Sequence, residues 1–258
     1  MRHLACLLAC CLSAGGIRAA EGTVSPAGDT VPANLLRIEL TFDRMFEAPL
    51  DMRHVHLYDE HGDEISDAFL DQPLPAADGR GVTILMHPGR IKSGLGPTML
   101  LGPALSADTN VKLVISAPTL RQPLVKQWRV IATKHDRLTP ARWKLDLPQA
   151  GGTTPLSIRL PSAMNAGAAQ LIAIGTSDGG RLPGKATFVP NSDVWKFTPA
   201  KAWRPGSYIL RVHPDIEDAA GNRLCAAFEE AHQSRLRCDD EARIDFRISA
   251  AQGNALKR

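Results

Sequence analysis

The sequence of 258 residues is poor in aromatic side chains, which make up 5% of it. Proteins that stack bases or sugars rely on aromatic rings, so this scarcity argues against both kinds of binding surface. An excess of one charge is also missing, because the formal net charge is only +3 and falls to about +1 without the two arginines of the first twenty residues. Such a balance exerts no strong electrostatic pull on nucleic acid, and we predict no nucleic-acid partner.

Recognisable catalytic motifs are missing as well. The chain contains no G-x-S-x-G, no H-E-x-x-H, no phosphate-binding glycine–lysine loop and no dinucleotide fingerprint. The glycine-rich segment 94–97 ends in a proline, which indicates a turn. General acid–base catalysis needs a carboxylate in water-poor surroundings, whereas alternation along the strand turns Glu39 outward and Asp43 begins a turn. We therefore predict no catalytic residues, no cofactor and no enzyme.

Long hydrophobic runs are missing after the N-terminal segment. There, Arg2 precedes a short apolar stretch at residues 4–12, and small residues lead to Ala19 and Ala20. This order is typical of a secretory signal peptide, and the stretch is too short for a permanent membrane anchor. We predict a signal peptide at residues 1–20, a periplasmic or cell-envelope location, and no transmembrane span in the mature chain. The alternative is a lipoprotein anchored at Cys10, because residues 7–10 resemble a lipobox.

Cysteine becomes scarce once the signal is removed. Three of the five cysteines lie in the signal, which leaves Cys225 and Cys238. Two cysteines in an exported chain are typical of one disulfide, and we predict that these two form it. A redox-active pair would favour the closer C-x-x-C spacing.

An internal repeat organises the rest of the chain. Each half contains five short segments in which apolar and polar residues alternate, as in strands of an antiparallel sandwich with one buried face. The segments at 35–42, 55–58, 82–86, 111–115 and 128–131 correspond in order to those at 156–160, 171–174, 194–199, 208–212 and 244–248. The 19 prolines and 21 glycines are spread along the chain, as turns between many short strands require.

The second half resembles a known family. It carries F-x-P at 197–199, P-G-x-Y at 205–208 and D-x-x-G-N at 218–222, a succession that resembles the bacterial immunoglobulin-like domains of S-layer and other envelope proteins (SbsA-type). The strong part of the likeness covers about 30 residues, and the first half lacks the D-x-x-G-N turn. The resemblance implies an immunoglobulin-like sandwich that serves as a spacer, scaffold or adhesion module. Independently of the family, Gly221 is expected to supply a positive φ in a turn between strands.

We therefore predict an all-β chain with two tandem antiparallel immunoglobulin-like β-sandwiches. A flexible leader is expected at 21–33, the first domain at 34–133, the second at 140–250 and a disordered tail at 251–258. The boundary falls at 133–140, where polar residues and Pro140 separate two finished sets of strands. Trp128, Trp143, Trp195 and Trp203 lie in or beside strands and are expected to pack in the cores or between the domains.

Two groups of polar residues are candidate metal sites. His54 and His56 are expected on one face of a strand, where they and His87 offer imidazole ligands to copper or zinc. The competing interpretation is a solvated strand face that happens to carry histidines. His213, Asp215, Glu217 and Asp218 precede the D-x-x-G-N turn and offer oxygen ligands to calcium, although the carboxylates are too few for a regular calcium loop.

The function predicted from these features is a non-enzymatic exported module that acts as a scaffold, a spacer or a protein-binding component of the bacterial cell envelope. Exposed strand edges would let it accept a strand from an unidentified protein partner of the envelope. The alternative is a periplasmic copper-binding protein that uses His54, His56 and His87.

Overall fold

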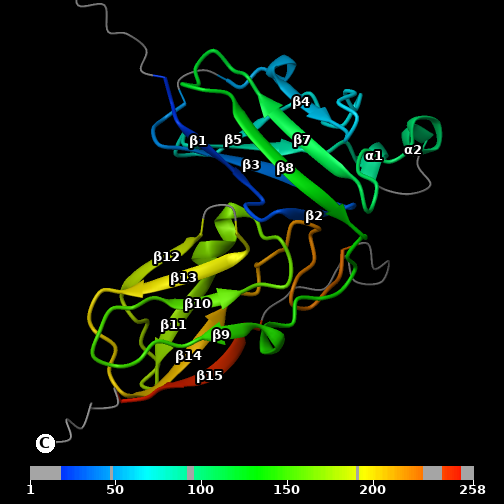
Figure 1. The fold of residues 1–258 in the computed structure, drawn as a ribbon. Coiled ribbons are helices and arrows are strands. Elements are labelled where there is room, and N and C mark those ends of the chain that lie inside the picture. Colours follow the sequence, from blue (N-terminus) through cyan, green and yellow to red (C-terminus); the bar gives the residue numbers. More distant parts are fainter. Residues whose placement is uncertain (1–18, 47–48, 92–95, 190–191, 229–239, 251–258) are drawn as a thin grey trace, which may run out of the picture.

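The computed structural model describes residues 19–46, 49–91, 96–189, 192–228 and 240–250 (Figure 1). Residues 1–18 of the predicted signal, Cys10, the predicted disulfide partner Cys238 and the predicted tail at 251–258 lie outside these ranges. Within them, no helix is long and apolar enough to cross a membrane.

The first half of the chain forms two four-stranded sheets. One has the order β1 (Gly22–Ser25), β3 (Arg37–Phe42), β6 (Gly81–Leu85) and β5 (Leu74–Pro75), and the other has the order β2 (Thr30–Pro32), β8 (Leu124–Ile131), β7 (Asn110–Ile115) and β4 (Val55–Tyr58). All neighbours are antiparallel except β2 and β8, which are parallel. Three short helices lie in the loops: η1 (Met52–His54), α1 (Pro88–Ile91) and α2 (Gly96–Leu101).

The second half forms a sheet of four strands and a sheet of three. The first has the order β12 (Gly184–Phe188), β13 (Val194–Pro199), β10 (Leu156–Arg159) and β9 (Lys144–Asp146), and the second has the order β11 (Ile172–Thr176), β14 (Gly206–Val212) and β15 (Ala242–Ile248). Two short 3-10 helices, η2 (Pro140–Arg142) and η3 (Ala166–Leu171), lie in the connections.

The order of pairing identifies the fold. In an immunoglobulin constant-type domain, the first, second, fifth and fourth strands form one sheet, and the third, sixth and seventh form the other. The seven strands β9 to β15 pair in this way, and so do the strands of the first half when β2 is set aside as an addition beside β8. The strand order is immunoglobulin-like. The five predicted correspondences between the halves all fall on strands in equivalent positions.

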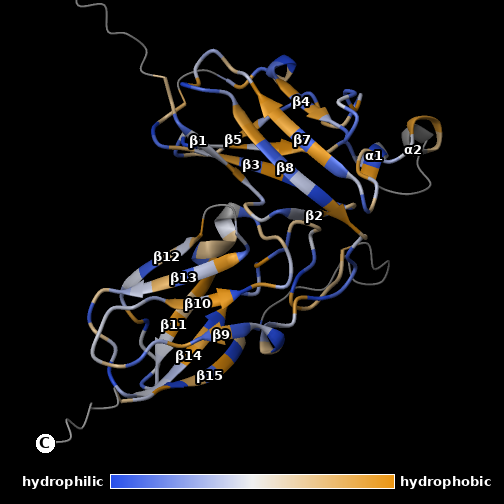
Figure 2. Cartoon of the chain, in the orientation of Figure 1, coloured by the Kyte–Doolittle hydropathy of each residue, from blue (hydrophilic) through white to orange (hydrophobic). Residues whose placement is uncertain are grey.

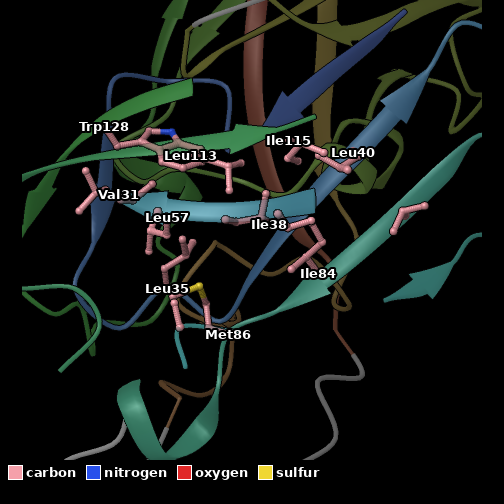
Figure 3. Packing of buried hydrophobic residues seen from close by; sticks show 14 of the residues in the cluster. Val31, Leu35, Ile38, Leu40, Leu57, Ile84, Met86, Leu113, Ile115 and Trp128 are labelled. Carbon is pink, nitrogen blue, oxygen red and sulfur yellow. The ribbon is translucent and has the colours of Figure 1, made fainter. Parts of the chain in front are cut away.

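Alternation along the strands builds a separate core between each pair of sheets. In β3, Ile38 and Leu40 are each 1% exposed, whereas Arg37 and Glu39, which alternate with them, remain partly exposed. Ile38 and Leu40 pack in one cluster with Leu57 and Leu113 of the opposite sheet (Figure 3). Figure 2 shows the hydrophobic residues concentrated on the strands. Each such side chain contributes roughly 1.5–3 kcal/mol by leaving water. The four tryptophans are all buried, Trp128 in the first core and the others in the second.

The predicted flexible leader at 21–33 is wrong, because these residues form β1 and β2. Thr23 and Val24 pair with β3, and Val31, beside β8, is fully buried in the first core. The folded part also includes Ala20, which is 4% exposed and whose N–H donates to the Thr119 carbonyl at 2.9 Å. Signal cleavage after Ala20 would remove this bond. The alternation in T-V-S and T-V-P spans too few residues to stand out from a loop.

Tyr208 in β14 fixes the corner that leads into its strand. Its hydroxyl donates to the Arg204 carbonyl at 3.0 Å and accepts from the Arg204 N–H at 3.2 Å, which is the tyrosine corner of immunoglobulin-like sandwiches. The ring packs edge-on against Trp203, with centroids 5.4 Å apart.

We expect Tyr208→Phe to lower the free energy of unfolding by about 1–2 kcal/mol, because the ring contacts stay while two backbone groups lose their partner. Urea unfolding followed by tryptophan fluorescence measures this change. Tyr58→Phe is the matched control, since Tyr58 lies half-buried on the outer face of β4 and should change stability little. Equal effects of the two substitutions would contradict the structural role of the Tyr208 hydroxyl.

Candidate functional site

The three histidines predicted to bind copper lie apart. His56 lies on the outer face of β4, as predicted, but His54 belongs to η1 and not to the strand. His87 follows β6 in the opposite sheet, and its Nδ1 accepts from the Gly89 N–H at 3.1 Å. The Nδ1 of His56 lies 2.7 Å from the Glu64 carboxylate. Within the described ranges, no group of three or more His, Cys, Asp or Glu side chains is arranged to hold a metal ion.

Of the residues proposed for calcium, Asp218 serves a turn, and Glu217 forms ion pairs with Arg37 and Arg223. Asp218 is 2% exposed, and its Oδ1 accepts from the N–H groups of Ala220 at 3.0 Å and Asn222 at 2.9 Å. The side-chain amide of Asn222 donates to the same carboxylate at 3.0 Å. Gly221 has φ +80°, as the D-x-x-G-N pattern predicted. Burial raises the pKa of Asp218, and its oxygens point into this closed turn.

Asp43 is tied to its neighbours in a similar way. Its carboxylate accepts from the Arg44 guanidinium at 2.9 Å and from the Glu21 N–H at 2.9 Å. The bond from Arg44 is the larger cause and the bond from Glu21 the second, and together they lower the pKa of Asp43 to about 2. A carboxylate that stays ionised at neutral pH is a poor general acid. The role of Asp43 is to fix the start of β1 through its bond to the Glu21 N–H.

The D-x-x-G-N turn also joins the two sandwiches, and the group that joins them is the carbonyl of Lys134 in the connector. This oxygen accepts from the side-chain amide of Asn34 in the first half at 2.9 Å and from that of Asn222 in the second at 3.1 Å. The N–H of Lys134 donates back to Asn34 Oδ1 at 3.0 Å. Both asparagines are buried, at 4% and 0% exposure, so the connector is held from both sides.

Direct contacts between the halves surround this point. The N–H of Leu36 donates to the Ala219 carbonyl at 3.0 Å, and Arg37 forms an ion pair with Glu217 at 3.0 Å. Ala219 and Ala163, both from the second half, are buried in the first hydrophobic core. Figure 1 shows the orange segment that carries Glu217 and Ala219 reaching up to the first sandwich. We call this set of contacts the junction.

A second part of the junction lies at Asp193, in the turn between β12 and β13. Its carboxylate packs against Gly28 so closely that a Cβ there would lie 2.3 Å from Asp193 Oδ2. Burial is the main cause that raises the pKa of Asp193, and Asp29 adds to it, while Lys126 opposes it. Lys126 donates to the Ala27 carbonyl at 2.7 Å, and burial lowers its pKa.

Asp193 gives the junction a pH dependence that Asp193→Asn should remove. Because its folded-state pKa is raised above the ordinary 3.8, its contribution to stability is full below that value and is lost as pH rises through the raised pKa. The stability of the native chain relative to Asp193→Asn should therefore fall with rising pH. Urea unfolding of both proteins between about pH 3 and pH 8 measures the difference, in which the shared effect of Asp218 cancels. Parallel stability curves would contradict the burial of this carboxylate.

No protein-family model and no curated protein sequence matches the chain. Among solved structures, a chimeric titin Z1Z2 carrying a decorin peptide aligns with 91% of this chain and 98% of its own at 10% identity and a TM-score of 0.24. The YadV chaperone aligns with 86% of this chain and 99% of its own at 12% identity and a TM-score of 0.27. Domains 5–6 of the S-layer protein SbsC align with 90% and 99% at 10% identity and a TM-score of 0.25. At these scores the fold assignment rests on the strand order alone.

Proposed function

We propose that the protein is a non-enzymatic, exported immunoglobulin-like module that acts as a scaffold, spacer or protein-binding component of the bacterial cell envelope, with a periplasmic or surface location. The observation that carries this proposal is the junction. A spacer must hold its two ends at a fixed distance and angle, and the Lys134 carbonyl, held by Asn34 and Asn222, removes the freedom of the connector. The resemblance to envelope domains in residues 197–222 supports the location.

The proposal includes two domains, now taken to begin at β1 and at residue 140. The two separate hydrophobic cores support this division. The disulfide between Cys225 and Cys238 stays part of the proposal.

Rotational diffusion tests the spacer role. Backbone ¹⁵N relaxation of the exported chain should give one rotational correlation time for both sandwiches. A single conformation should also fit its small-angle X-ray scattering curve. The double variant Asn34→Ala/Asn222→Ala is the loosened reference and should show two shorter correlation times. Two independent correlation times in the native chain would contradict the proposed spacer role.

A further inference from the structure

A groove lies between the two sandwiches, beside the junction. It has a volume of about 570 Å³, within the range of sites that hold ligands. One wall is β1 of the first sandwich and the other is the end of β12 in the second. The start of β8 and part of η3 also line it, with Val125 and Ala169.

Both walls are edge strands. Strand β1 lies at the edge of one sheet and β12 at the edge of another, and within the described residues no named strand pairs with the outer side of either. The outer side of β1 is bonded at Ala20, before the strand begins, where an isolated bridge joins Ala20 to Leu120. An unpaired edge presents a row of backbone N–H and C=O groups that another strand can bond.

The registers show which backbone groups point outward. Asp43 N–H donates to the Glu21 carbonyl, so alternation along β1 turns the N–H and C=O of Gly22 and Val24 away from β3. Val189 N–H donates to the Val194 carbonyl, so Ala186 is likewise turned away from β13, as is Phe188. Gly22, Val24, Ala186 and Phe188 all line the groove. Two free edges from different sandwiches therefore border one space.

The side chains of the lining favour an uncharged occupant. Ala27, Ala169 and Ala186 are small and leave the backbone accessible, and Val125 adds an apolar surface that is 58% exposed. Strand β1 carries neither a charged residue nor a proline, the usual protections of an edge. The Lys126 ammonium is bonded to the Ala27 carbonyl.

We propose that this groove binds an extended, uncharged segment of another protein, which adds as a strand between β1 and β12. The four residues of β1 match a segment about 13 Å long. Alternate side chains of the segment would face the alanines and Val125, while its backbone bonds the outward groups of Val24 and Ala186. This inference rests on the proposed function, because it names the site and the chemistry of its protein-binding role.

The probe is a capped, fluorescent peptide of about seven alternating valines and threonines. Fluorescence anisotropy should show saturable binding to the full exported chain. Val24→Pro and Ala186→Pro each remove an outward N–H that takes no part in the native ladder, and each should weaken binding about tenfold or more. Lys185→Ala, next to Ala186 but outside the groove lining, should leave binding unchanged.

Two readouts keep the test decisive if a proline variant fails to fold. N-methylation of alternate peptide amides should abolish binding to the native chain, and bound peptide should slow amide hydrogen exchange at Val24 and Ala186. No saturable binding, equal binding of the methylated peptide, or a dimer of this chain that the peptide does not disrupt would each overturn the proposal. A loss with only one proline variant would support strand addition at that edge. A single correlation time without peptide binding would contradict peptide binding in the groove, whereas the proposed spacer role would still hold.

Discussion

Asn222→Ala is expected to lower the free energy of unfolding by about 2–4 kcal/mol and to loosen the two sandwiches from each other. The side chain is fully buried, and its amide donates to the Lys134 carbonyl and to Asp218, while its Oδ1 accepts from the Phe228 N–H at 3.0 Å. Truncation removes these bonds together, and each buried group left without a partner costs about 1–3 kcal/mol. Urea unfolding measures the stability, and ¹⁵N relaxation measures the loosening.

The matched control is Asn110→Ala, since Asn110 is exposed at the start of β7 and should change neither quantity. A stability loss in Asn222→Ala without any change in correlation time would mean that the turn matters only within the second sandwich. The junction would then have to be assigned to the contacts of Leu36 and Arg37.

Trp195→Ala is expected to have the largest effect of all, a loss of about 3–5 kcal/mol. Trp195 is fully buried in β13, stacks near Phe197 with ring centroids 6.1 Å apart, and donates its indole N–H to the Ala169 carbonyl at 3.1 Å. Removing the ring leaves a cavity in the second core and also releases η3. Thermal unfolding should show the second sandwich melting first, as a separate early transition.

Trp128→Ala provides the comparison in the first core, where the melting order should reverse. Leu147→Ala is the control for a hydrophobic residue at 40% exposure and should cost far less. A loss below about 1 kcal/mol in Trp195→Ala would contradict the packing of the second core.

Period-two alternation in the sequence was sufficient to find the strands that cross the cores. The ten matched segments fall on β3, β4, β6, β7 and β8 and on their partners, because each of these strands buries alternate residues against an opposite sheet. The strands that were missed are β1, β2, β5, β9 and β12, which have two to five residues and all lie at sheet edges. No side chain of β5, β9 or β12 is fully buried, and β1 and β2 are too short to show an alternation, so all five carry little hydrophobic pattern.

The junction was not predicted because its contacts join residues far apart in sequence. Lys134 lies 100 positions after Asn34 and 88 positions before Asn222, and nothing local marks an asparagine that will be buried. The D-x-x-G-N motif did predict the positive φ of Gly221, since a turn is a local structure. The placement of His54 was wrong for the opposite reason, because proximity in sequence put it in a strand that begins only at Val55.

The position of Lys134 has a consequence for dissecting the chain. Its carbonyl takes one bond from each half, so a cut in the connector leaves the buried amide of the half that loses Lys134 without its acceptor. Ala163 and Ala219 would be withdrawn from the first core at the same time. The pair of sandwiches is therefore the smallest unit that can be expressed or fused without exposing surface that is buried in the whole chain. Either half alone would lack part of its buried contacts.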